Sequence, residues 1–227
     1  MTANDIYQHY RPDESDFIDA VLGWMQWVDN RFAAYLSPFL TPREAKIVRQ
    51  LVGNHNDIKV AFNGGYTGSE RQRALLYPLY YEVKEEDFDL QALNINFPEK
   101  FAELSHGRIL GTFMSTGIDR NRIGDIISDG QSWHMIVDAS MTDYFVTNIH
   151  KIANFGVHLE LISCQDLLES EESWQTIFVL ASSLRLDTLL SKVYNFSRQR
   201  AKNSVSSGLV KVNFLEMNRP DLQVGEE

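Results

Sequence analysis

Three segments near the C-terminus decide how the chain is interpreted: Ser183-Leu-Arg-Leu-Asp187, Asn195-Phe-Ser-Arg-Gln-Arg-Ala-Lys202 and Ser207-Gly-Leu-Val-Lys-Val-Asn213. From the first segment onward, leucines and a valine recur at i, i+3, i+4 and i+7, which predicts one apolar face of a helix. Ser197 is a good N-cap for a second helix, and Gly208 is a good residue to end it. Valines in the last segment alternate with polar residues, as on a half-buried strand. We therefore predict two short helices followed by a strand.

Side chains outside the apolar positions of these segments are mostly basic. Arg198 and Lys202 are four residues apart and should share a helix face, with Arg200 beside them and Lys211 on the polar side of the strand. Such a surface is suited to a polyanion, because cationic side chains on folded proteins bind phosphate groups. The candidate RNA-binding residues are Arg185, Arg198, Arg200, Lys202, Lys211 and Asn213.

The same stretch resembles the S4 RNA-binding module. That module follows the pattern Arg-Leu-Asp, then Ser-Arg-x-x-Ala, then Gly-x-Val-x-Val-Asn, and the three segments match it in order and at the same spacing. The resemblance implies a small αL-type S4 domain over residues 182–227. It also implies that the second helix and the following loop lie against folded RNA.

The net charge of the 227-residue chain is −10, which is unusual for an RNA-binding protein until it is divided by position. Residues 182–213 contain six basic side chains and one acidic side chain, a net charge of +5. Residues 214–227 carry −3, and the first 181 residues carry −12. The asymmetry favours a local phosphate-binding face on an acidic protein.

Composition narrows the class of protein further. The chain is 44% hydrophobic, which is ample for packed cores, and its single cysteine cannot form an internal disulfide. The N-terminus lacks the features of a secretion signal, and no apolar run approaches the ~20 residues that span a bilayer. We expect a soluble, cytoplasmic protein with no membrane partner.

The first part of the chain, residues 1–79, is predicted to be a mostly helical domain. Asp13 to Asp16 form an acidic helix start, and Thr41-Pro42 places an N-cap before a proline at the first helical position. A short strand at 58–62 leads into the glycine-rich segment Asn63 to Arg71, which lacks the spacing of a nucleotide-binding loop and is interpreted as a turn into a helix. Arg71 and Arg73 would then face either solvent or an RNA backbone.

Residues 80–181 are predicted to form a domain with the element order β-α-β-β-α-β. Asp129-Gly130 between two apolar segments is a strong hairpin signal. This order is that of a ferredoxin-like fold, which RNA-recognition (RRM-like) domains share, although the Gly-Phe-x-Phe signature of such domains is missing. The expected strands are at 90–97, 123–128, 133–137, 156–162 and 174–181, and the expected helices are at 99–116 and 142–153.

Segments outside the S4-like module resemble the bacterial YlmH family. They are Phe39 to Arg43, Gly64-Gly-Tyr66 with Glu70-Arg71, Leu104-Ser-His-Gly-Arg-Ile-Leu-Gly111 and Gly117 to Ile126. The resemblance covers essentially the whole chain. It implies an α+β protein with an N-terminal domain, an RRM-like middle domain and a C-terminal S4 domain.

The resemblance also implies a non-catalytic protein that binds rRNA and tRNA on the large ribosomal subunit, in quality control or rescue of stalled nascent chains, with a link to cell division. Two features depart from the family pattern. Gly107-Arg108 stands where the family has an Arg-Asp pair, and the sequence stops at Glu227, before a further strand and a basic segment of the usual S4 domain. We therefore expect a truncated S4 domain with a lower RNA affinity than the family's.

Two alternatives stay open from the sequence: an RNA-modifying enzyme of the pseudouridine-synthase type, and a protein-interaction adaptor that uses its acidic surface. The six histidines and Cys164 form no metal-ligand spacing, and there is no G-x-S-x-G elbow. The Asp187 context matches a catalytic aspartate of pseudouridine synthases in its letters, but it falls within the S4-like helix. We expect no catalytic residue, metal, cofactor or small-molecule substrate.

Overall fold

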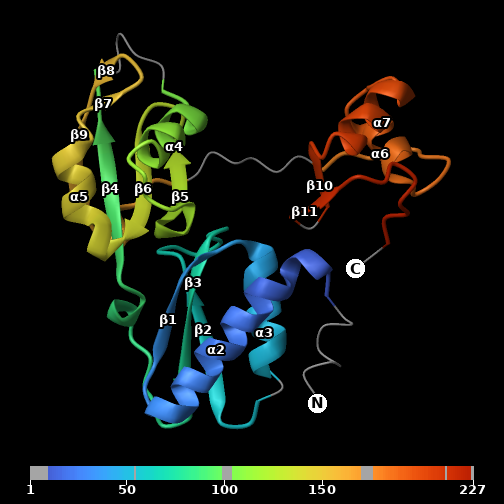
Figure 1. Ribbon diagram of the computed structural model, residues 1–227. Coiled ribbons are helices and arrows are strands. Elements are labelled where there is room, and N and C mark those ends of the chain that lie inside the picture. Colours follow the sequence, from blue (N-terminus) through green and yellow to red (C-terminus); the bar gives the residue numbers. More distant parts are fainter. Residues whose placement is uncertain (1–9, 54, 99–103, 170–175, 213, 226–227) are drawn as a thin grey trace. The chain divides into compact units, whose positions relative to one another are not determined.

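A computed structural model describes residues 10–53, 55–98, 104–169, 176–212 and 214–225 of the chain (Figure 1). It divides into two compact units, residues 1–171 and 172–227. The described elements are short helices and several small antiparallel sheets, so the predicted α+β class is confirmed. The predicted domain boundaries stay predictions.

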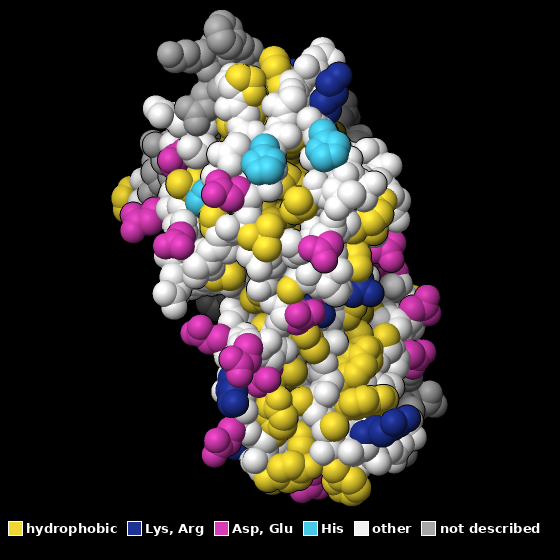
Figure 2. Space-filling view, turned by 90° about the vertical axis from the view of Figure 1, so that its left-hand side faces the viewer, with side chains coloured by type: hydrophobic (Ala, Val, Ile, Leu, Met, Phe, Trp, Pro, Cys, Tyr) yellow, Lys and Arg dark blue, Asp and Glu magenta, His cyan; other side chains and the backbone are white. Residues whose placement is uncertain are grey.

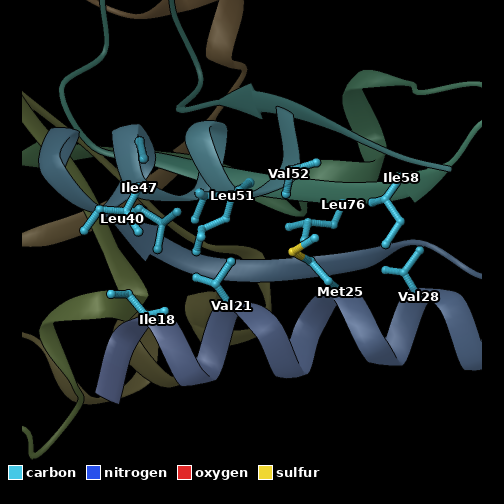
Figure 3. Close-up of a cluster of buried hydrophobic side chains, with 13 residues drawn as sticks. Ile18, Val21, Met25, Val28, Leu40, Ile47, Leu51, Val52, Ile58 and Leu76 are labelled. Atoms are coloured by element: carbon cyan, nitrogen blue, oxygen red, sulfur yellow. The ribbon is translucent and has the colours of Figure 1, made fainter. Parts of the chain in front are cut away.

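The first part of unit 1 is built around a helix that packs on a three-stranded sheet. Helix α2 (Ser15–Arg31) buries one residue per turn, because Ile18, Val21, Met25 and Val28 lie on a single helical face. Figure 3 shows these side chains pointing toward the sheet, where they meet residues of α3 (Pro42–Gly53). The sheet has the order β1-β3-β2, with β1 at Tyr35–Leu40, β2 at Ile58–Asn63 and β3 at Gln72–Pro78.

The prediction of a mostly helical N-terminal part is wrong about β1 and β3. Strand β1 contains Pro38 and accommodates it at a bulge between Leu36 and Phe39. The Ala74 N–H donates to Ser37 Oγ (2.8 Å), which supplies an acceptor where the ladder is interrupted. The glycine-rich segment likewise leads into strand β3, and not into the expected helix.

The second part of unit 1 is a four-stranded antiparallel sheet with the order β5-β6-β4-β9. Its main elements follow one another as strand, helix, strand, strand, helix, strand, as the sequence predicted. Side chains from both helices and all four strands of the sheet form one core cluster, so the two helices cover the same face of the sheet. The bounds are β4 Leu90–Asn96, α4 His106–Met114, β5 Ile123–Ser128, β6 Trp133–Asp138, α5 Thr142–Asn148 and β9 His158–Ile162.

Three elements predicted for residues 80–181 differ from the structure. Helix α4 begins only at His106, because Ser105 has extended backbone angles, and residues 99–103 of the predicted helix lie outside the described residues. Helix α5 ends at Asn148, and the chain then forms the small hairpin β7 (Lys151–Ile152) and β8 (Phe155–Gly156). The strand predicted over 174–181 is wrong for the described residues 176–181, which pair with no strand.

The two sheets of unit 1 are joined by a polar junction centred on Asp125 of β5. Its carboxylate accepts hydrogen bonds from the Tyr66 hydroxyl (2.9 Å) and from the backbone N–H groups of Glu70 (2.7 Å) and Arg71 (3.0 Å). Gly124 lies so close to Phe39 that an added Cβ would sit 2.8 Å from a ring carbon. The glycine therefore lets the ring of β1 pack directly on the second sheet.

Unit 2 is a small module of two helices and a hairpin. Helix α6 spans Leu186–Val193, α7 spans Arg198–Ser206, and β10 (Val210–Val212) pairs with β11 (Leu215–Met217). Leu186, Val205 and Met217 form its core. The described parts of the two helices and the strand lie where the sequence predicted them, and Gly208 ends α7 with a positive φ of 71°.

Candidate nucleic-acid interface

Helix α7 holds three of the six predicted RNA-binding residues, and its first turn is fixed by a side-chain cap. The Ser197 hydroxyl accepts a hydrogen bond from the Arg200 N–H (3.2 Å). Ala201 and Val205 are completely buried and orient the helix on the module's core. Arg198 and Arg200 are exposed, and Lys202 is half-buried.

Arg185 is bound to a buried carboxylate within the module. Asp187 has no exposed surface, and its two oxygens accept hydrogen bonds from Arg185 Nε and Nη2, both at 3.1 Å. The Arg185 hydrogen bonds hold the pKa of Asp187 below its usual range, against the opposing effect of burial. Because Arg185 makes a bidentate contact with a buried acid, its role is structural. The sequence did not reveal this role.

Arg198 extends this ion pair toward the surface. Its Nε lies 4.0 Å from Asp187 Oδ2, while 66% of its side chain is exposed. Asp187 therefore connects the first turns of α6 and α7, and Arg185 and Arg198 lie close together because both contact its carboxylate. Lys202, one turn further along α7, lies on the same helical face as Arg198.

Arg200 belongs to a different side of α7. It is two residues from Arg198, which is about 200° around a helix. Its guanidinium carbon lies 4.0 Å from the centroid of the Phe196 ring, and that ring stacks on Tyr194 at 5.6 Å with an interplanar angle of 29°. The expectation that Arg200 lies beside Arg198 and Lys202 therefore fails, and two neighbouring aromatics join the candidate surface.

The remaining predicted residues lie at the hairpin. Lys211 is exposed at the middle of β10, and Glu216 is its cross-strand partner. Its charge therefore has an acidic neighbour, a feature that the order of residues along the chain did not indicate. Asn213 lies outside the described residues.

Unit 1 contrasts with this basic module. Figure 2 shows one face of the molecule, over which acidic side chains are spread. The face of the second sheet that carries Ile127 and Ile136 is contacted by Phe39, Tyr66 and Leu168. An RNA-recognition domain would need that face open for bases, so the geometry directs attention to unit 2.

The two arginines after the glycine-rich segment lie inside unit 1. Arg73 is only 5% exposed and donates to the carbonyl oxygens of Ser37 (2.9 Å) and Asp89 (3.1 Å). Arg71 donates to the carbonyl oxygens of Ile123 (3.1 Å) and Phe39 (3.2 Å). Burial lowers the pKa of both arginines, and neither side chain is placed to hold an RNA backbone.

The glycine-rich segment lines a pocket of about 660 Å³ in unit 1. Glu85 and Glu86 line the same pocket, and the Gly65 N–H is already used by Asn63 Oδ1 (2.8 Å). Carboxylates repel phosphate, and a committed amide cannot cradle it. These contacts favour the interpretation of the glycine-rich segment as a turn, and they argue against a phosphate site.

Among the residues that the structure describes, no group of three or more His, Cys, Asp or Glu side chains is arranged to hold a metal ion. The described helices also include none with the length and hydropathy of a membrane span. Cys164 is half-buried in unit 1, and burial raises the pKa of its thiol.

Fold and charge together define an α+β protein with small antiparallel sheets and a basic C-terminal module. Residues 13–81 match the family model described as "YlmH, N-terminal", and residues 83–166 match the one described as "Putative RNA-binding domain in YlmH". The chain belongs to the YlmH family, as its sequence motifs predicted.

Two further proteins are similar to the chain over most of its length. "Ribosome-associated protein quality control protein P2" of Bacillus subtilis (strain 168) is 37% identical over 223 residues, which is 98% of this chain and 86% of that protein. A solved structure, "Cell division protein ylmH from Streptococcus pneumoniae", is 29% identical with a TM-score of 0.63. That match covers 72% of this chain and 99% of the solved one.

Proposed function

We propose that this chain is a non-catalytic, cytoplasmic protein that binds structured RNA, namely rRNA and tRNA, on the large ribosomal subunit. The name of the Bacillus relative refers to ribosome-associated quality control, and the same role, in the rescue of stalled nascent chains, is proposed for this chain. The proposal is supported by the family's RNA-binding domain and by the basic module at the C-terminus.

The proposed organisation has three parts: residues 1–79, an RRM-like domain at 80–181 and an S4 domain at 182–227. The strand order β5-β6-β4-β9 and its helical connections agree with a ferredoxin-like middle domain. The capped α7 and the hairpin after it agree with an S4-type module. In this organisation the first two parts form an acidic carrier, and the third holds the RNA.

The observation that carries the proposal is the contrast in charge between the two ends of the chain. Residues 182–213 have a net charge of +5 in a chain of −10. A local basic face lets a protein of acidic overall charge bind a polyanion, because at physiological salt the repulsion from acidic groups more than about 8 Å away is largely screened.

Sedimentation of cell extract tests the ribosomal partner. We expect the protein to travel with the large subunit and to leave those fractions after RNase treatment. Retention after RNase would instead favour the protein-interaction adaptor. An RNA modification that disappears when the gene is deleted, detected by mass spectrometry of total RNA, would favour the RNA-modifying enzyme.

The name of the Streptococcus structure supports a second role. It refers to cell division, and the family resemblance implied the same link. Depletion of the protein with measurement of cell length and septum position tests this role. Normal division in depleted cells, together with loss of ribosome-associated quality control, would restrict the proposal to translation.

Arg198→Gln combined with Lys202→Gln is expected to weaken RNA binding without unfolding the module. If four or five phosphates are neutralised by the wild-type protein, the log–log salt slope is roughly −3 to −5, and loss of two contacts reduces its magnitude by about 1.4–1.8. Filter binding at a series of salt concentrations measures the slope. Glutamine is preferred to glutamate because a carboxylate at position 198 would lie beside the buried Asp187.

The matched control removes two positive charges from unit 1. Lys59 and Lys151 are both exposed there, and Lys59→Gln with Lys151→Gln gives the same change in net charge. Its salt slope should equal that of the wild type. If the magnitude of the salt slope fell equally in both double variants, the fall would be due to net charge. That result would contradict a binding face on α7.

A further inference from the structure

Three flat side chains form a stack at the junction of α6 and α7. Tyr194 follows the last residue of α6, and Asn195 turns the chain with a left-handed φ of 52°. Phe196 then lies against Tyr194, and the guanidinium of Arg200 lies 4.0 Å from the Phe196 ring centroid. The Ser191 hydroxyl donates to the Phe196 carbonyl oxygen (2.7 Å) and holds the junction in place.

This stack is separate from the core of the module. The core cluster consists of Leu186, Val205 and Met217 with aliphatic side chains packed around them, and neither aromatic ring of the stack takes part in it. Tyr194 is 60% exposed. A large ring left exposed outside the core contributes little to folding, and aromatic rings beside cationic side chains serve as stacking platforms in proteins that bind single-stranded nucleic acid.

Charge around the stack identifies the chemistry of its ligand. Arg200 is exposed, and its guanidinium lies over the Phe196 ring, so it supplies the positive charge of the stack. A stacked guanidinium keeps its positive charge and its N–H donors for a phosphate, while aromatic rings offer a π-face to a base. A nucleotide carries both a phosphate and a base, so it fits both parts of the stack.

We propose that Tyr194 is a stacking platform for a single unpaired RNA base, so that the module prefers RNA with an unstacked nucleotide to a continuous duplex. The inference rests on the proposed RNA-binding function and adds a specificity to it. Within an A-form helix each base is covered by its neighbours, whereas a bulged nucleotide can turn out and place its face on a protein ring. Arg200 packs on the Phe196 ring, which in turn lies against Tyr194, and its guanidinium adds a positive charge that attracts the RNA backbone.

Two RNA hairpins test the preference with the full chain: one has a continuous stem, and the other has the same stem with one extra unpaired 2-aminopurine nucleotide. We expect the bulged hairpin to bind tighter by roughly tenfold, the order of one base–aromatic stack. The fluorescence of the 2-aminopurine should fall on binding, because a stacked base is quenched. Equal affinity for both hairpins would overturn the inference, whereas no binding to either would overturn the proposed function itself.

Variants at the stack separate the ring from the charge. Tyr194→Leu should reduce the affinity for the bulged hairpin to that for the continuous stem, with an unchanged salt slope, whereas Tyr194→Phe should keep the preference. Arg200→Lys keeps the charge but removes the planar group, and it should lose part of the preference. Circular dichroism should show the same helix content in all three. A preference that survives Tyr194→Leu would overturn the assignment.

Discussion

Asp187→Ala is expected to destabilise the C-terminal unit by about 3 kcal/mol while unit 1 keeps its stability. The substitution removes a fully buried carboxylate that Arg185 grips with two hydrogen bonds and that accepts a third from Thr188 Oγ1 (3.3 Å). Loss of a buried ion-pair partner costs about 3 kcal/mol, the lower end of the usual range because the freed Arg185 can be rehydrated. A unit of this size has a stability of roughly 3–8 kcal/mol, so the loss is between roughly 40% and all of the total.

Hydrogen exchange measured by mass spectrometry resolves the two units separately. Peptides from α6 and α7 should exchange about two orders of magnitude faster in the variant, and peptides from α2 and β6 should be unchanged. Asp221→Ala is the matched control, because Asp221 also pairs with an arginine at 3.1 Å but on the surface. Faster exchange in both variants, or in neither, would contradict a structural role specific to the buried pair.

The pH dependence of the stability of unit 2 gives a second test of the role of Asp187. Because the folded-state pKa of Asp187 is lowered, its stabilising contribution is complete above the unfolded pKa of about 3.9 and is lost as the pH falls through the folded pKa. Wild-type unit 2 should therefore lose exchange protection at acidic pH more steeply than the variant. A variant with the wild-type acid response would assign that response to another carboxyl group.

The sequence predicted best those elements whose signals are local. Ser197 caps α7 and Gly208 ends it, as the sequence pattern indicated. Asp129 and Gly130 connect β5 and β6, and the Asp129 carboxylate accepts the Ser132 N–H (2.7 Å). Such features depend on a few neighbouring residues and need no information about the rest of the fold.

Elements that depend on distant partners were missed. Strand β1 contains Pro38, and only the bulge opposite β3 shows why a proline is tolerated there. The segment at 176–181 has the composition of a strand, yet Phe178 and Leu180 are more than 95% exposed and lack a neighbouring strand among the described residues. Strand formation requires a partner edge, and sequence composition does not say whether one is present.

The candidate site shows the same division. Composition identified the basic character of α7. The ion pair of Arg185 with Asp187, however, depends on burial of a carboxylate that the sequence placed only within the S4-like helix. The sequence did contain a signal for the stack, and it was overlooked. Arg200 comes four residues after Phe196, and Tyr194 comes two residues before it. Aromatic residues flanking a basic helix therefore merit the same attention as its charges.

Asp138→Ala is expected to destabilise unit 1 by about 3–5 kcal/mol, because it leaves a buried arginine without its nearest buried acid. Asp138 is 1% exposed and lies 3.5 Å from Arg73 Nη1. It also accepts hydrogen bonds from Arg122 (2.7 Å) and from the Ser140 hydroxyl (2.7 Å). Burial alone would raise the pKa of Asp138, but the hydrogen bonds from Ser140 and Arg122 and the charge of Arg73 lower it overall, so the carboxylate is ionised in the folded state.

The pair also connects the two sheets, since Arg73 belongs to β3 and Asp138 ends β6. Urea denaturation followed by circular dichroism measures the loss, and hydrogen exchange assigns it to unit 1. Removal of both charges in Arg73→Met with Asp138→Ala leaves no uncompensated buried ion, so the double variant should be more stable than the sum of the single losses predicts. Additive losses would mean that the two groups do not interact, and the connection between the sheets would then rest on Asp125 and on the packing of Phe39 against Gly124.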